Sequence, residues 1–458
     1  MTLEVTDRNY MWWAALPVLL GMFIVIMDNS VVNVALPRIM GAFGSDVKEI
    51  EWVSTGYMLA AAVMMPTTGF LGDRFGRRRL YAGAIALFTL VSLLCGLAWD
   101  TASLVAFRIL QGAVGGAIPP IGQAILFEAF PPHRRGLSMA LVGVGVMLAP
   151  TIGPTLGGYL VDFLDWRWIF FVNLPVGMAA ATLAWWIVRD NPARRVGFDA
   201  VGFAFMAIFL TTLLLAFSHG TGQGWASANI RGLFLAAAIS FVAFLAVSLR
   251  RTDAIVDLRL YAIPTYTAGT LASVVVGIGL FGSLFLLPLF LQNLMGRDAL
   301  HTGLLLLPQG LTMALTMPLS GLLLGRLDPR LLLGCGLGAV SLSLFLQAGM
   351  TVETPDGEIV AWTVLRSVGF ALAFPAMNQT SLGAVPIERI GHASGLYNVT
   401  RQIGGTFGIA LLATILAHQQ SQVPAFQEAF RLAGIIALIG IGPTLFMVPR
   451  RRPDPSKD

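Results

Sequence analysis

Residues 69–79 read GFLGDRFGRRR, and residues 321–330 read GLLLGRLDPR. The second segment resembles a degenerate copy of the first, and each one follows a long apolar run. When the first arginine of each segment is aligned, Arg74 and Arg326 stand 252 positions apart. A segment that recurs at this distance predicts an internal repeat, so we expect the chain to contain two related halves.

The composition predicts a membrane protein. Of the 458 residues, 56% are hydrophobic and 12% are charged, about half the charged share of a soluble domain. A hydrocarbon core about 30 Å thick needs roughly 20 apolar residues per helix, and the chain holds fourteen runs of that kind. We predict transmembrane helices over residues 12–36, 51–72, 79–98, 104–127, 136–160, 166–188, 199–217, 231–249, 266–292, 303–324, 331–350, 359–383, 395–417 and 428–448.

The repeat predicts how these spans are grouped. Arg108 in the fourth span aligns with Arg366 in the twelfth, 258 positions away. Because six spans occupy about 190 residues, a repeat of about 255 residues leaves room for two additional spans between the halves. We therefore predict an all-α polytopic fold with a six-helix bundle over residues 1–190, two additional spans and a linker over 191–260, and a second six-helix bundle over 261–458. Such repeats around a central site are typical of transporters that work by alternating access.

The distribution of arginine and lysine predicts the orientation. With the N-terminus inside, 20 basic residues fall on the cytoplasmic side and 6 on the opposite side. The cytoplasmic group includes Arg8, Arg194, Arg195 and the tail from Arg450 to Lys457. We therefore expect both termini in the cytoplasm and the protein in the cytoplasmic membrane. The first span contains Asp28 and is too long for a signal-peptide core, so we expect it to be retained.

Four motifs carry a family resemblance. Residues 69–81 are similar to the signature between spans two and three of the major facilitator superfamily, and GPTLGG at 153–158 resembles the signature of its antiporters. MDNSVVNVALPRI at 27–39 and DWRWIFFVNLPVG at 165–177 look like the fourteen-span drug:proton antiporters of the EmrB/QacA type. This resemblance implies the major facilitator fold, an export function and a proton gradient as the energy source, with no cofactor.

Asp28 is the acidic residue that lies clearly inside a predicted span. An acid at the centre of a membrane helix costs roughly 2.5–3.5 kcal/mol, so we expect Asp28 to face a cavity and to serve a purpose. Burial favours its protonated form and a nearby arginine favours its ionised form, which suits a proton carrier. The family associates the arginine at position 108 with proton coupling, so we assign Asp28 and Arg108 to that role. The alternative is that both are structural, bound to neighbouring helices.

Polar residues inside the spans are candidates for lining a substrate cavity. Arg108 is followed at helical spacing by three glycines, Pro119 and Gln123, a stripe that we expect to face the cavity. Arg366 and Arg401 are the equivalent candidates in the second half. The full set of cavity candidates is Asn29, Asn33, Gln111, Gln123, Arg366, Asn378, Arg401 and Gln402.

The charged segment after the second span predicts a conformational latch at the membrane interface, where charges and helix ends pair in one state and separate in another. The second copy has Gly325 at the position of Asp73, so the two halves are not expected to contribute equally. The alternative is that these arginines only set the topology. The predicted latch consists of Gly69, Asp73, Arg74, Gly76, Arg77, Arg78 and, as a partner for the arginines, Glu128.

Residues 149–158 read APTIGPTLGG and predict a bent fifth span with a smooth face. We expect this face to pack closely against a helix of the second half and to restrict leakage during antiport. The alternative is packing without a role in transport. The antiporter motif consists of Pro150, Gly153, Pro154, Gly157 and Gly158.

The sequence predicts no metal site and no enzyme, because its five histidines show neither metal-ligand nor catalytic spacing. The expected partners are a small-molecule substrate, the lipid bilayer and protons, without nucleic acid; accessory export proteins are not readable from the sequence. We predict a proton-coupled antiporter that exports amphiphilic drugs or other small organic compounds by alternating access. An importer or facilitator of a small metabolite, and an exporter of a dedicated natural product or organic acid, remain alternatives.

Overall fold

A computed structural model describes residues 9–191, 197–251, 254–324, 326–418, 422–445 and 447. These residues form helices joined by short turns, with no strand among them, so the predicted all-α fold is confirmed. The predicted cytoplasmic residues Arg8, Arg194, Arg195 and Arg450 to Lys457 lie outside the described residues, as does Gly325.

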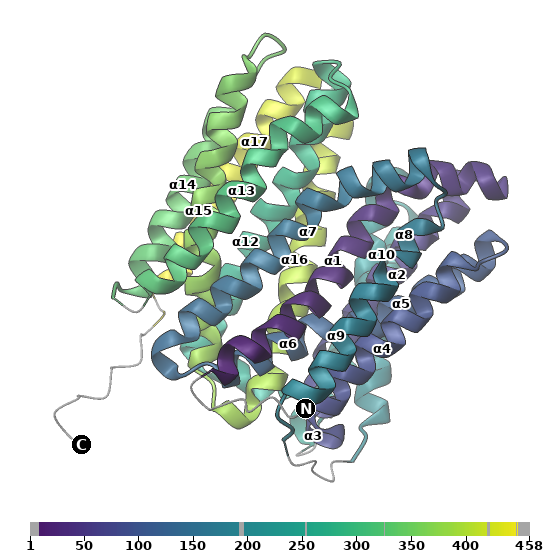
Figure 1. The fold of residues 1–458 in the computed structure, drawn as a ribbon. Helices are drawn as coiled ribbons and strands as arrows, with labels where there is room; N and C mark the ends of the chain where they lie inside the picture. The colour runs from purple at the N-terminus through teal and green to yellow at the C-terminus, as the bar shows by residue number, and fades with distance from the viewer. Residues whose placement is uncertain are drawn as a thin grey trace.

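The first half contains the first six predicted spans, drawn in purple and blue in Figure 1. Its helices are α1 (Tyr10–Phe43), α2 (Val47–Met64), the 3-10 turn η1 (Met65–Thr67), α3 (Thr68–Phe75), α4 (Arg77–Gly96), α5 (Thr101–Gly115), α6 (Ile118–Ala129), the 3-10 turn η2 (Pro132–Arg134), α7 (Arg135–Phe163), α8 (Trp168–Phe171) and α9 (Asn173–Ile187). The predicted fourth span is divided into α5 and α6, because two consecutive prolines, Pro119 and Pro120, fit only the first turn of a new helix.

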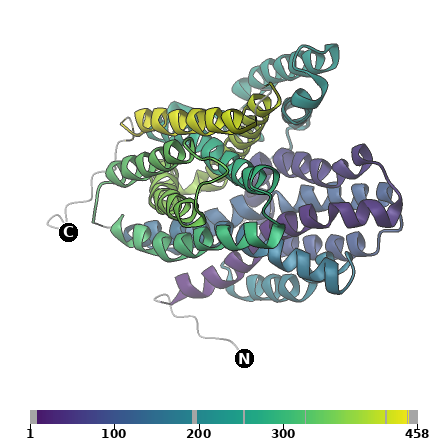
Figure 2. The ribbon, with the colours of Figure 1, turned by 90° about the horizontal axis from the view of Figure 1, so that it is seen from above.

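The two additional spans and the second half follow in teal, green and yellow. Their elements are α10 (Ala200–Gln223), α11 (Ala228–Arg250), the 3-10 turn η3 (Leu258–Ala262), α12 (Pro264–Leu289), the π-helical turn η4 (Phe290–Leu294), α13 (Ala299–Leu323), α14 (Pro329–Gln347), α15 (Asp356–Gly383), the 3-10 turn η5 (Ile387–Arg389), α16 (Ile390–His418), α17 (Gln422–Ile439) and α18 (Ile441–Thr444). The α10–α11 hairpin lies at the edge of the molecule (Figure 2).

Thirteen helical segments of the described residues are long and apolar enough to cross a membrane. The remaining predicted span corresponds to α2, which has 18 residues and carries Lys48, Glu49 and Glu51 near its start. Together α2, η1 and α3 follow one another from residue 47 to residue 75, so a helical segment exists for each of the fourteen predicted spans.

The packing of the helices repeats in the two halves. In the first half α1 packs on α7, α2 on α5, and α4 on α9. In the second half the equivalent helices do the same: α12 packs on α16, α13 on α15, and α14 on α17. The internal repeat predicted from the spacing of equivalent arginines is therefore also a structural repeat. The two six-helix bundles with two additional spans are confirmed.

The two halves meet at one end of the molecule and separate toward the other. Along the α7–α13 seam, Gly136 packs against Gly321 and Thr151 against Gly310, each without room for an added Cβ atom on the glycine. Further along the same two helices, a Cβ atom on Gly158 or Gly303 would meet nothing within 4 Å. The seam is therefore closed at the end where α7 begins.

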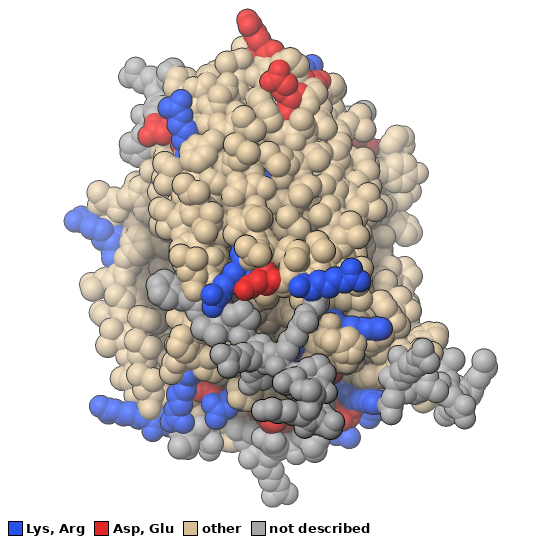
Figure 3. All heavy atoms as spheres, turned by 90° about the vertical axis from the view of Figure 1, so that its left-hand side faces the viewer, with Lys and Arg blue, Asp and Glu red and all other residues tan. Residues whose placement is uncertain are grey.

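The charge distribution agrees with a membrane protein. On the face shown in Figure 3, charged side chains lie at the top, in a row across the middle and along the bottom, and the broad area between the middle row and the top carries little charge. Large apolar side chains are exposed on the outer helices, among them Leu235, Ile239 and Val242 of α11 and Leu315 and Leu319 of α13. Such an exposed apolar belt fits contact with lipid.

Candidate functional site

Asp28 of α1 and Arg108 of α5 form a buried ion pair. Arg108 Nη1 lies 2.6 Å from Asp28 Oδ2, and neither side chain is exposed. Arg108 also donates to the backbone carbonyl of Val53 in α2 through Nε, at 3.1 Å. An unpaired charge at this depth would be strongly unfavourable, so the two side chains hold each other in place.

Two amides complete the surroundings of Asp28. Asn173 Nδ2 donates to Asp28 Oδ1 at 2.6 Å, and Gln111 Nε2 donates to the same oxygen at 3.2 Å. Gln111 Oε1 in turn accepts from Arg108 Nη1 at 2.6 Å. Asn173, the first residue of α9, also donates to Ser92 of α4 at 3.1 Å. Side chains of α5 and α9 therefore bind the carboxylate of α1, and Ser92 of α4 binds Asn173.

Close helix packing places the arginine. A Cβ atom on Gly112 would overlap with the backbone of Tyr57, and one on Gly116 would overlap with the backbone of Ala61. These glycines let α5 approach the backbone of α2, which brings Arg108 within reach of the Val53 carbonyl. Of the stripe predicted to face the cavity, Gly115, Gly116, Pro119 and Gln123 line it, and Gly112 and Gly116 also bring two helices of the first half together.

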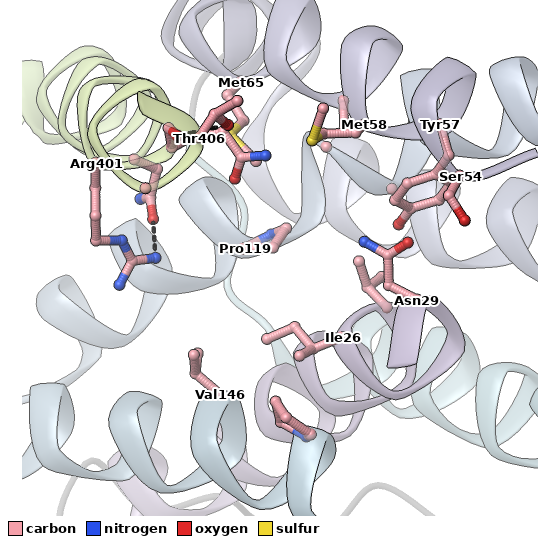
Figure 4. Close-up of a pocket in the computed structure, with 18 of the residues that line it drawn as sticks. Ile26, Asn29, Ser54, Tyr57, Met58, Met65, Pro119, Val146, Arg401 and Thr406 are labelled. Carbon is pink, nitrogen blue, oxygen red and sulfur yellow. Dashed lines mark hydrogen bonds between the residues drawn. The ribbon is translucent and has the colours of Figure 1, made fainter. Parts of the chain in front are cut away.

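A cavity of about 530 Å³ lies between the halves. Its wall is largely apolar and is formed by side chains of α1, α2, α6, α7, α12, α15 and α16. Figure 4 shows Asn29 and Tyr57 on one side of this cavity and Arg401 on the other. Ser218 of the additional helix α10 also lines it, and α10 packs against both α2 and α16. The cavity therefore has walls from both halves and from one additional span.

The structure separates the predicted cavity residues into two groups. Five of them line the cavity: Asn29, Asn33, Gln123, Arg401 and Gln402. The others do not: Gln111 belongs to the Asp28 network, Asn378 binds Gln123, and Arg366 is buried between Gln309 and Gln347, to which it donates at 3.0 Å each. The sequence placed these residues inside the spans but did not show which helix interface each one faces.

Asp28 and Arg108 were also expected to face the cavity, and they do not line it. Tyr57 and Asn29 lie between the pair and the cavity: both line it, the Tyr57 ring lies 4.2 Å from the guanidinium carbon of Arg108, and Asn29 Oδ1 accepts from Arg108 Nη2 at 3.4 Å. The ion pair is therefore one side chain away from the substrate space. The expectation is wrong for this conformation because Arg108, Asn173 and Gln111 bind the Asp28 carboxylate inside the first bundle.

A chain of amides connects the halves beneath the cavity. Gln123 Nε2 of α6 donates to Asn378 Oδ1 of α15 at 2.5 Å, and Asn398 Nδ2 of α16 donates to Gln123 Oε1 at 2.7 Å. Arg401 Nη2 donates to Asn398 Oδ1 at 3.0 Å. All three amide side chains are buried. One residue of the first half thus bridges two residues of the second, in a place where each hydrogen bond is shielded from water.

The model of the Major Facilitator Superfamily matches residues 18–409, with a second match over residues 269–458. The chain belongs to this superfamily. It is therefore a membrane transporter and not an enzyme.

Individual relatives agree with this assignment. The multidrug resistance protein B homolog of Mycobacterium tuberculosis is 35% identical over 422 residues, which cover 89% of this chain and 76% of the relative. The multidrug export protein EmrB of Escherichia coli is 32% identical over 407 residues, which cover 88% and 79% of the two chains. A double tryptophan mutant of XylE shares the fold, with a TM-score of 0.70, 15% identity and 97% of each chain covered. The resemblance to exporters of the EmrB type is thus confirmed.

The superfamily signature between α2 and α4 forms two sets of contacts. Within the first half, Arg77 pairs with Glu128 of α6, and Arg78 and Arg79 lie 3.6 and 3.4 Å from Asp190. Gly76 has a φ of 83°, and a Cβ atom there would overlap with the Asp190 carboxylate, so glycine is required at this turn. Arg74 lies near the rings of Phe70 and Phe75.

The same signature also touches the second half. Asp73 Oδ2 lies 3.3 Å from His392 Nε2 of α16, and Gly69 packs directly on the backbone of His392. Gly391 contacts Gly69, with 3.3 Å from its added Cβ position to the Gly69 Cα atom. Asp190 and His392 were not among the predicted latch residues, because neither lies in the signature nor in its repeat.

The antiporter motif packs differently from the prediction. It lies in α7, which continues as one helix through Pro150 and Pro154. A Cβ atom on Gly153 would meet Ser30 and one on Gly157 would meet Val31, both in α1 of the same half. The expected contact with the second half is therefore wrong for these two glycines in this conformation, whereas Thr151 of the same segment packs against Gly310 of α13. The small side chains of the motif therefore do not predict which helix packs against it.

Proposed function

We propose that this transporter exports amphiphilic drugs or other small organic compounds in exchange for protons, with Asp28 as the proton carrier. The observation that carries the proposal is the Asp28–Arg108 ion pair, which is fully buried yet separated from the cavity only by Tyr57 and Asn29. The export function of the relatives, a multidrug export protein among them, supports the direction of transport.

The chemistry at Asp28 supports a proton-exchange cycle. A proton that reaches Asp28 neutralises the carboxylate and removes its attraction for Arg108. Arg108 then keeps its contacts to Gln111 and to the Val53 carbonyl but loses its counter-ion. A change in the α1–α5 packing follows, because the two helices no longer share an ion pair. Loss of the proton on the other side of the membrane restores the pair and resets the packing.

The proposed orientation places both termini in the cytoplasm. In that orientation the end of the molecule where Gly69 packs on His392 faces the cytoplasm, and the end that holds Gly158 and Gly303 faces outward. The conformation described is then closed to the cytoplasm, with Glu51 near the outer start of α2 lining the cavity. In this state the protein would release substrate and take up a proton.

Several further parts of the proposal rest on the sequence. We place the domain limits at residues 190 and 260, on either side of the α10–α11 hairpin. The energy source is the proton gradient, and no cofactor takes part. The partners are the substrate, protons and the bilayer, and an accessory export protein is compatible with this arrangement.

The experiment uses purified protein in liposomes with an imposed pH gradient and ethidium as the transported probe. We expect ethidium to move against the direction of proton flow, and Asp28→Asn to abolish the gradient-driven movement while ethidium still binds. Asp162→Asn is the matched control, since Asp162 is a surface acid 3.5 Å from Arg38. Movement of ethidium together with protons would establish import instead, and a fully active Asp28→Asn would exclude Asp28 as the carrier.

A further inference from the structure

Arg401 presents a positive charge to the cavity. Its guanidinium points into the open space in Figure 4, and Arg401 is one of the lining residues. Nη2 donates to Asn398 Oδ1 at 3.0 Å, and the guanidinium carbon lies 5.2 Å from the centre of the Phe374 ring. These are neutral partners. Within the described part of the chain, no carboxylate forms an ion pair with Arg401.

The other ionisable residues of the region do not compensate this charge. Asp28 is already paired with Arg108 and does not line the cavity. Among the lining residues the one carboxylate is Glu51, the fifth residue of α2. On the closed side, Met65 at the far end of α2 lines the cavity, and its carbonyl lies beside Gly395, six positions before Arg401. Glu51 and Arg401 therefore mark different levels of the cavity.

The remainder of the wall suits an apolar body. Met22, Ile26, Met58, Val146 and Leu284 come from four helices and surround the space into which Arg401 points. Methionine side chains adapt their shape to different apolar partners, so this wall does not require one rigid ligand. A ligand that fits both features has an apolar body and a single head group of negative charge.

The amide chain holds Arg401 in position. Asn398 Oδ1 accepts from Arg401, and Asn398 Nδ2 is fixed by Gln123 Oε1 at 2.7 Å and by the Ser394 carbonyl at 2.8 Å. The guanidinium therefore does not need to reorganise to receive a ligand. A planar guanidinium with free donors matches the two oxygens of a carboxylate, which it binds through two parallel hydrogen bonds.

We propose that Arg401 is the head-group subsite of the cavity and that its ligand class is an amphiphile bearing one carboxylate. The inference rests on the proposed function, because it takes the cavity as the transport site. A carboxylate at Arg401 would share the guanidinium with Asn398 Oδ1. Binding at the subsite is thereby connected to the Asn398–Gln123 hydrogen bond that joins the two halves.

The test is a binding measurement that needs no gradient. The full chain is placed in phosphatidylcholine nanodiscs, and the binding of radiolabelled laurate, dodecanol and dodecyltrimethylammonium is measured at alkaline pH, with empty nanodiscs subtracted. The three probes share a twelve-carbon chain and differ in head-group charge. We expect the wild type to bind laurate roughly ten- to a hundredfold more tightly than dodecanol, the range of a hydrogen bond to a charged group.

The variants assign this preference to one side chain. Arg401→Gln should bind dodecanol as the wild type does and lose the preference for laurate, whereas Arg401→Lys should keep part of it. Arg431→Gln, which removes an exposed arginine of α17, should behave as the wild type. If Arg401→Gln binds none of the probes, Arg401→Lys provides the test. A preference of Arg401→Lys for laurate supports the subsite, and the loss of that preference contradicts the subsite.

Two results would overturn the subsite: equal binding of all three probes by the wild type, or wild-type preference for laurate in Arg401→Gln. These results are separable from failure of the proposed function. Proton-driven ethidium transport without a laurate preference contradicts the subsite alone. A laurate preference that depends on Arg401, in a protein without gradient-driven transport, contradicts proton exchange alone.

Discussion

The centre of the Tyr57 ring lies 4.2 Å from the guanidinium carbon of Arg108, and the same tyrosine lines the central cavity. The side chain is buried, with its hydroxyl among the buried groups that have no hydrogen-bond partner in the described residues. One aromatic ring therefore forms the partition between the proposed proton site and the proposed substrate space. A movement of side chains on either side of this ring is transmitted to the other side through direct contact with Tyr57.

Removing the ring should open the proton site to the cavity. In Tyr57→Ala we expect Asp28 to react with a hydrophobic carbodiimide, which modifies protonated carboxyl groups, several times faster than in the wild type. Tyr57→Phe retains the ring and should react as the wild type does. Mass spectrometry of the peptide that contains Asp28 measures the modification. Equal rates in the alanine and phenylalanine variants would show that Tyr57 does not restrict access.

Asn173 should adjust how tightly Asp28 holds its proton. Its amide donates to the carboxylate at 2.6 Å, which stabilises the charged form. In Asn173→Leu that stabilisation is lost, so the proton should be held about tenfold or more tightly and its release should move to higher pH. The pH dependence of ethidium exchange measures the change.

Ser92→Ala is the control for Asn173, because Ser92 binds Asn173 and not Asp28. It should leave the pH dependence close to that of the wild type. A profile for Asn173→Leu that coincides with the wild-type profile would mean that the amide only packs α9 against α1.

Gly112 should be required for the position of Arg108. A Cβ atom at this residue overlaps with the backbone of Tyr57, so Gly112→Ala must push α5 away from α2. We expect a lower melting temperature and weaker proton-driven exchange. Gly83→Ala in α4 is the matched control, since its Cβ atom would meet nothing within 4 Å. A thermal unfolding curve for Gly112→Ala equal to that of Gly83→Ala would refute the close packing.

The contact between Asp73 and His392 should hold the end of the molecule where α7 begins closed. In a background without Cys95 and Cys335, cysteines at positions 73 and 392 should be joined by a short bifunctional thiol reagent, because the native side chains lie 3.3 Å apart. Joining them should stop exchange, and reductive cleavage of the link should restore it. Exchange at the full rate with the link in place would show that this contact does not open during transport.

Much of the fold was predictable because long apolar runs fix the helices. The ion pair of Asp28 and Arg108, 80 positions apart, was also predictable, since a buried acid needs a counter-charge. Asn173 was not identified, although it lies in the DWRWIFFVNLPVG motif, because it stands near the start of the predicted span 166–188, where a polar side chain is not unusual. The packing partner of Gly153 and Gly157 was predicted wrongly, because small side chains permit close packing but do not specify which helix packs against them.

The most direct measurement is proton release from the purified transporter when substrate is added in weakly buffered solution. We expect the wild type to release protons on binding ethidium, and Asp28→Asn to bind ethidium without releasing any. Equal proton release by both proteins would contradict the assignment of Asp28 as the group that exchanges its proton for substrate.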